Sequence, residues 1–151
     1  MLLEPKLIFI HRKEAKMLRL KASLQIFVVE DDDEDILILC ETCKDVGLLN
    51  VHCFHDIRNL VRYAHSNGTT PEVILFDVGQ AASEGPEIFE KMASDDLLRT
   101  VPIIFVSGSE PFKEVLNRRY PHLKIDRFLT KPITVEALSM MLQPFTHLLE
   151  N

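Results

Sequence analysis

Polar side chains follow four short apolar runs of this 151-residue sequence, and together their types could carry out phosphoryl chemistry. The residues concerned are Glu30 with Asp31, Asp77, Ser107 with Gly108, and Lys131. Crowded carboxylates repel one another unless a cation lies among them, and oxygen ligands select a hard ion such as Mg²⁺. Asp77 would then be the nucleophile that accepts a phosphoryl group, while Lys131 and the Ser107 hydroxyl bind the phosphoryl oxygens. Gly108 has no side chain and leaves room for that group.

The elements that must position these residues follow from the apolar pattern. We expect five strands, at 24–29, 51–54, 73–76, 102–106 and 127–130. We also expect five helices, at 36–46, 57–67, 86–92, 111–119 and 134–142. Pro144 should end or kink the last of these helices. Strands that alternate with helices predict an α/β, doubly wound, five-stranded parallel sheet of order 2-1-3-4-5, with helices on both faces. The carboxyl ends of such strands share one rim, where all four sets of polar residues meet.

Residues 24 to about 150 resemble the receiver domain of two-component response regulators, which has a CheY-like, flavodoxin-like fold. The residues that carry the resemblance, in order and at family spacing, are Glu30-Asp31, Asp77, Gly85, Ser107-Gly108, Phe128 and Lys131-Pro132. The resemblance implies that Asp77 accepts a phosphoryl group from a histidine kinase or a histidine phosphotransfer protein. The resemblance therefore implies that the chain is a phosphoacceptor in a phosphorelay.

The resemblance also implies a role for each matching residue. Asp31, Asp77 and the backbone carbonyl of Gly79 would bind Mg²⁺ directly, and Glu30 would act through water. Ser107, Gly108 and Lys131 would stabilise the phosphoryl group, and a cis peptide bond would join Lys131 to Pro132. Ser107 and Phe128 would form the switch that reshapes the face of the fourth helix, fifth strand and fifth helix, where a downstream protein binds.

Composition favours a cytoplasmic protein. A formal net charge of −6 argues against a nucleic-acid surface, no segment is apolar enough to span a bilayer, and three cysteines fit a reducing compartment. We expect a basic N-terminal extension of unknown role at 1–22 and the receiver domain at 23–151. Because no residues remain for an output domain, the chain is expected to be a stand-alone regulator rather than an enzyme. Whether it forms a homodimer stays open.

Three other functions compete with this interpretation. An aspartate-dependent phosphatase would place a second aspartate two residues after the nucleophile, where this chain has Gly79. A flavin-binding electron carrier would need Ser, Thr and Gly after the first strand, whereas the acidic run here would repel a phosphate. A degenerate receiver that serves as an interaction scaffold without phosphorylation is the remaining alternative.

The cysteines allow two further interpretations. Cys40 and Cys43 have the spacing of a redox pair, but their position in the middle of a helix favours inert thiols. With Cys53 and the nearby His52 and His55 they could form a zinc site, although the spacing matches no standard one.

Overall fold

A five-stranded parallel sheet forms the centre of the molecule in the computed structural model, which describes residues 22–77, 79, 87–108, 114, 118 and 127–148. The strands are β1 (Gln25–Val29), β2 (Asn50–Phe54), β3 (Val73–Asp77), β4 (Ile103–Ser107) and β5 (Arg127–Thr130). They lie in the order β2-β1-β3-β4-β5, and every neighbouring pair is parallel. The predicted fold class and strand order are confirmed.

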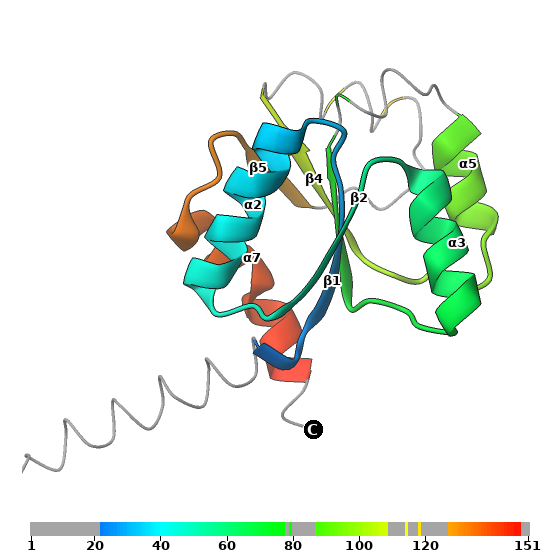
Figure 1. Cartoon of the computed structure of the whole chain (residues 1–151), viewed down its shortest axis with the longest axis horizontal. Helices are drawn as coiled ribbons and strands as arrows, with labels where there is room; N and C mark the ends of the chain where they lie inside the picture. Colours follow the sequence, from blue (N-terminus) through cyan, green and yellow to red (C-terminus); the bar gives the residue numbers. More distant parts are fainter. Residues whose placement is uncertain are drawn as a thin grey trace, which may run out of the picture.

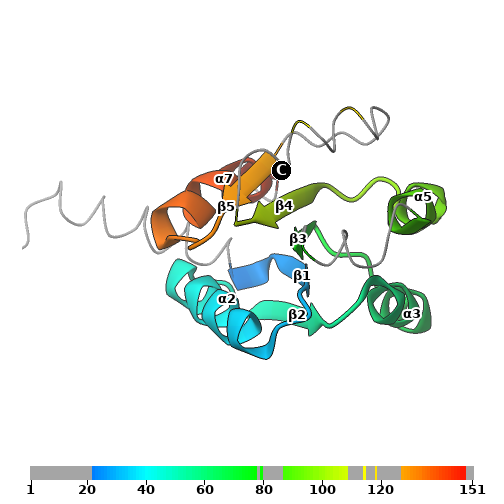
Figure 2. The same ribbon diagram turned by 90° about the horizontal axis from the view of Figure 1, so that it is seen from above.

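Helices cover both faces of this sheet and make three layers. On one face α2 (Asp33–Val46) and α7 (Val135–Leu148) lie together, and on the other are α3 (Ile57–Asn67) and α5 (Glu87–Ser94) (Figures 1 and 2). Of the helices in the described ranges, none is long and apolar enough to cross a membrane.

Side chains alternate along each strand and so build two separate apolar clusters. The cluster under α3 and α5, named here the Phe27 cluster, contains Phe27, Val29, Ile57, Leu60, Ala64, Ile74, Phe76, Ile88, Met92, Leu98 and Phe105. The cluster under α2 and α7, named here the Leu39 cluster, contains Leu24, Ile26, Val28, Leu39, Cys43, Val46, Leu48, Val73, Leu75, Ile104, Val106, Leu129, Leu138, Leu142 and Phe145. The central strands are therefore buried on both faces, which explains their almost uninterrupted apolar sequences.

The helix boundaries near the rim follow from capping residues. The Asp32 side chain accepts a hydrogen bond from the backbone N–H of Asp35 at 2.9 Å and begins α2. Gly47 ends this helix in the left-handed conformation, with φ of 99°, which a residue with a side chain adopts only with strain. Asp56 and Gly68 cap the two ends of α3 in the same manner. The expected last residue of α2 and both ends of α3 are confirmed, whereas α2 begins at Asp33 and not at Ile36 as expected.

The predicted end of the last helix is wrong. Thr134 caps α7 as expected, accepting a hydrogen bond from Ala137, but the helix includes Pro144 and continues to Leu148. A proline inside a helix costs about 3 kcal/mol because it removes one backbone hydrogen bond. Phe145 offsets part of this cost, since its ring is buried in the Leu39 cluster and lies 4.4 Å from the Arg127 guanidinium.

Some predictions fall outside the described residues. These are the extension at 1–21, Gly85, Pro86 and most of the helix at 111–119, of which Glu114 and Arg118 are described and are helical.

Candidate functional site

The carboxyl ends of four strands bring the predicted polar residues to one rim of the sheet. Glu30 directly follows β1, Asp77 ends β3, Ser107 ends β4 and Lys131 directly follows β5. The Glu30, Asp77 and Ser107 side chains are buried, which is unusual for such polar groups. The backbone N–H of Lys131 donates to the carbonyl oxygen of Ser107 at 2.8 Å and so joins the ends of β4 and β5.

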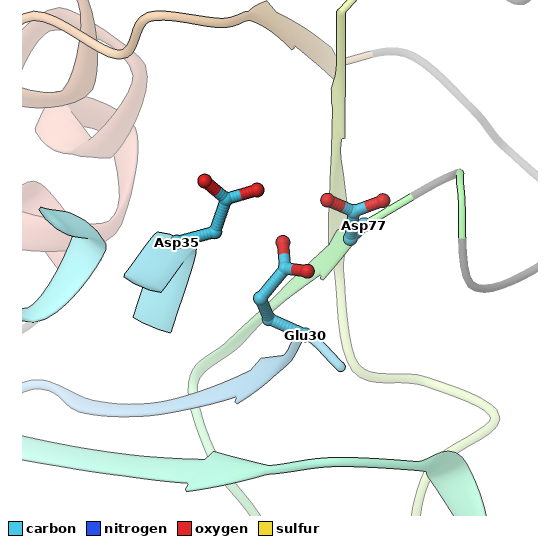
Figure 3. A group of neighbouring side chains, drawn as sticks. All are labelled: Glu30, Asp35 and Asp77. Atoms are coloured by element: carbon cyan, nitrogen blue, oxygen red, sulfur yellow. The ribbon is translucent and has the colours of Figure 1, made fainter. Parts of the chain in front are cut away.

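The Lys131 ammonium lies among three carboxylates at this rim. Its Nζ atom is 2.6 Å from Asp77 Oδ2, 2.7 Å from Asp35 Oδ2 and 3.2 Å from Glu30 Oε2. Figure 3 shows the three carboxyl groups converging from the end of β1, the first turn of α2 and the end of β3. Charge-assisted hydrogen bonds of this length are strong, so Lys131 is held firmly in this position.

The second oxygen of Asp77 is held by the backbone. The N–H of Gly79 donates to Asp77 Oδ1 at 2.6 Å. A Cβ atom placed on Gly79 would lie 2.9 Å from the same oxygen, so any larger residue there would push the carboxylate aside. Both oxygens of Asp77 therefore have fixed positions.

The pKa values of the two buried acids of the site, Glu30 and Asp77, are shifted in opposite directions. Burial and a hydrogen bond to Asp77 raise the pKa of Glu30 from 4.5 to about 8. Burial alone would also raise the pKa of Asp77, but hydrogen bonds from Glu30 and Lys131 outweigh it and bring this pKa below the usual value. Asp77 is thus the ionised member of the pair, consistent with its shorter distance to Lys131. An ionised, positioned carboxylate is what a nucleophile requires.

Lys131 is the cation that this arrangement stabilises. Burial alone would lower its pKa, but the hydrogen bonds to Asp35, Asp77 and Glu30 raise it above the usual value. The lysine therefore keeps its charge at neutral pH.

The donor atoms suit Mg²⁺. Carboxylate oxygens of Glu30, Asp35 and Asp77 lie within 4.8 Å of one another, and hard oxygen ligands are those that Mg²⁺ prefers. These are the residues that could hold the ion. Asp31 is exposed and is not in this group, and its expected role as a direct ligand stays a prediction, as does that of the Gly79 carbonyl.

Asp35 is the member of the site that sequence reasoning missed. It belongs to the acidic run at 30–35, and carboxylates in such a run also favour the start of a helix. The signal that could have identified it is the N-cap, Asp32, because a side chain in the first turn of a helix is directed back toward the helix N-terminus. That direction here leads to the rim where Glu30 and Asp77 lie.

The remaining predicted residues lie around this centre. The Phe128 ring is partly buried, packs against the Phe27 cluster and stacks on Phe105 with centroids 6.1 Å apart. A Cβ atom on Gly108 would meet no described atom within 4 Å, so the space beside it is open. The peptide bond between Lys131 and Pro132 is cis, as the resemblance implies.

The cysteines take no part in this rim. Cys43 is buried, and Cys40 has its sulfur 3.2 Å from that of Cys53 instead. Burial raises the pKa of the Cys43 and Cys53 thiols to about 12, which makes thiolates rare at neutral pH. Among the residues that the structure describes, no cysteine–histidine set brings ligand atoms close enough to hold a metal ion. The redox and zinc interpretations therefore gain no support.

The raised pKa of Glu30 leads to a testable pH dependence. Unfolded Glu30 ionises near 4.5 and the folded residue near 8, so the folded metal-free protein binds more protons between these values and loses stability as the pH rises. Mg²⁺ requires ionised ligands and should offset this loss. We expect the melting temperature in EDTA to fall between about pH 6 and pH 8.5, and saturating Mg²⁺ to raise it more at the higher pH.

Glu30→Gln is the matched control, because glutamine keeps the shape and cannot ionise. The melting temperature of this variant in EDTA should therefore lack the part of the pH dependence that is due to Glu30. If wild type and Glu30→Gln fall in parallel between about pH 6 and pH 8.5, Glu30 is not the group responsible.

Several solved structures with similar folds are response regulators or receiver domains. The bacteriophytochrome response regulator AtBRR has a TM-score of 0.67 and 22% sequence identity, with 80% of this chain and 90% of that chain covered. The chemotaxis response regulator CheY4 of Vibrio cholerae has a TM-score of 0.61 and 21% sequence identity, with 80% of this chain and 97% of that chain covered. A third similar structure is the receiver domain of the sensor histidine kinase PA1611 from Pseudomonas aeruginosa PAO1, which was solved with a magnesium ion coordinated in its active site cleft. It has a TM-score of 0.66 and 21% sequence identity, with 83% of this chain and 99% of that chain covered.

Sequence comparison assigns the family. No curated protein sequence matches the chain significantly. The sequence profile of the response regulator receiver domain, however, matches residues 26–143, which is most of the chain and includes every residue of the rim described above. This chain belongs to the response regulator receiver domain family.

Proposed function

We propose that this protein is a phosphoacceptor of two-component signalling in which Asp77 takes a phosphoryl group from a histidine kinase or a histidine phosphotransfer protein. The observation that carries the proposal is the state of Asp77. Its carboxylate is buried, has a lowered pKa, and is held by Lys131 Nζ and the Gly79 N–H, each at 2.6 Å. A carboxylate this constrained is prepared for in-line attack.

The transfer uses groups of this chain throughout. An Asp77 oxygen attacks the phosphorus of the donor phosphohistidine, the new P–O bond forms as the P–N bond breaks, and the imidazole leaves and takes up a proton. Lys131 and the Ser107 hydroxyl bind oxygens of the arriving group, and the open space beside Gly108 admits it. Bound Mg²⁺ supplies positive charge to the phosphoryl oxygens during transfer.

The output of this protein is proposed to be a contact with a downstream protein. Ser107 moves toward the phosphoryl group and Phe128, now stacked on Phe105, turns to reshape the face that includes β5 and α7. The chain acts only on its own phosphorylation state and is no enzyme toward other molecules. A cytoplasmic location and a receiver domain at 23–151 after an N-terminal extension belong to the same proposal.

The proposal is tested by intact-mass measurement after incubation with acetyl phosphate. We expect a gain of one phosphoryl group in the presence of Mg²⁺ and no gain in EDTA. Hydroxylamine should remove the group, because it cleaves acyl phosphates and leaves serine phosphates intact. A folded protein that gains no mass while a known receiver does so in the same buffer would favour the scaffold function instead.

A further inference from the structure

Lys131 would compete with a divalent cation for the carboxylates of the rim. The carboxylates that could hold Mg²⁺ are the same ones that contact its Nζ atom, at 2.6 Å for Asp77, 2.7 Å for Asp35 and 3.2 Å for Glu30. Two cations placed among these oxygens repel each other strongly in a partly buried site. Entry of Mg²⁺ therefore requires the ammonium to leave some of its partners.

Asp35 differs from the other two acids in a way that suits it to receive the ammonium. The side chains of Glu30 and Asp77 are only 4% and 9% exposed, whereas that of Asp35 is 40% exposed. Glu30 and Asp77 also come from strand ends, while Asp35 comes from the first turn of α2. An ammonium paired with Asp35 alone can be solvated, so this position costs little desolvation energy.

We propose that Asp35 is a positioning residue for Lys131, which keeps the ammonium at the rim when a divalent cation takes Glu30 and Asp77. The inference rests on the proposed function only in that Mg²⁺ binds at this rim. Without Asp35, the ammonium has Glu30 and Asp77 as its remaining carboxylate partners in the group, and Mg²⁺ must compete with it for both. Asp35 thus sets how readily Mg²⁺ enters and where Lys131 waits for the phosphoryl group.

The test measures Mg²⁺ binding itself by titration calorimetry, without a phosphodonor. Asp35→Asn is compared with Asp33→Asn, which removes the same charge from the same acidic run. Asp33 is the matched control because its side chain is 86% exposed and it contacts His55 at 2.8 Å. We expect Asp35→Asn to weaken Mg²⁺ binding about tenfold more than Asp33→Asn does, because only the former removes a carboxylate partner of Lys131. Asp35→Glu should restore part of the affinity.

A double-mutant cycle with Lys131→Met separates positioning from direct metal ligation. If Asp35 acts through Lys131, Asp35→Asn in the Lys131→Met background weakens Mg²⁺ binding no more than Asp33→Asn does there. An undiminished loss in that background would make Asp35 a metal ligand and overturn the proposal.

Two other results would also overturn the proposed role of Asp35. Equal affinities of Asp35→Asn and Asp33→Asn, with wild type binding Mg²⁺ normally, overturn this proposal and leave the proposed function intact. Absence of Mg²⁺ binding by the wild type would overturn both, since the phosphoryl transfer described above depends on the ion.

Discussion

Asp77→Asn is expected to gain no phosphoryl group from acetyl phosphate or from a phosphorylated kinase under conditions in which the wild type gains one. Asparagine has the same shape, but its amide oxygen carries no charge and is a poor nucleophile. We expect neither Glu30 nor Asp35 to accept the group in its place, since Asp77 is the carboxylate that both Lys131 Nζ and the Gly79 N–H hold, each at 2.6 Å. Intact-mass measurement at several time points tests whether the variant has lost the ability to accept a phosphoryl group.

The matched control is Asp56→Asn at the start of α3. Asp56 caps this helix by accepting a hydrogen bond from the Asn59 N–H at 2.8 Å, and asparagine caps helices about as well as aspartate. This variant removes one carboxylate near the same end of the sheet, so it should fold and accept the phosphoryl group at the wild-type rate. A phosphoryl group found on Asp77→Asn would show that a different side chain is the acceptor.

Phe27→Ala should remove much of the stability of the domain. Phe27 is fully buried in β1, and its ring lies 5.2 Å from that of Phe54 and 5.7 Å from those of His52 and Tyr63. Truncating such a side chain costs about 3–5 kcal/mol, a large share of the roughly 5–15 kcal/mol that holds a small domain folded. Urea titration should show a lower midpoint with an unchanged slope.

Leu49→Ala is the control for that change. Leu49 is 75% exposed, so its truncation should alter the free energy of unfolding by no more than about 0.5 kcal/mol. A loss below about 1 kcal/mol for Phe27→Ala would mean that the Phe27 cluster is not tightly packed.

The sheet and the centre of the site could be predicted because they depend on local sequence and on topology. Each strand is an apolar run that stops at a polar residue, and in a parallel sheet those stops share one rim. This argument alone places Glu30, Asp77, Ser107 and Lys131 together. The last residue of α2 and both ends of α3 were also predictable, because their caps involve residues next to the helix in sequence.

Features that depend on packing between distant elements could not be predicted. Asp35 enters the site because the packing of α2 against the sheet and α7 aims its first turn at Lys131, which is 96 residues away in sequence. The continuation of α7 past Pro144 depends on the burial of Phe145 beside Arg127 of β5. The N-cap Asp32 gives the direction of the first turn of α2, but the local sequence does not show which distant residue either contact would reach.

The separation of the two apolar clusters has a consequence for how this protein can evolve. The Phe27 and Leu39 clusters share no side chain, and substitutions at sites without shared partners have nearly additive effects. Asp35 and Lys131 belong to elements of the Leu39 side, α2 and the segment leading into α7. The α3–α5 layer can therefore drift, or be redesigned to recognise a new partner, without compensating changes in the layer that holds these two residues.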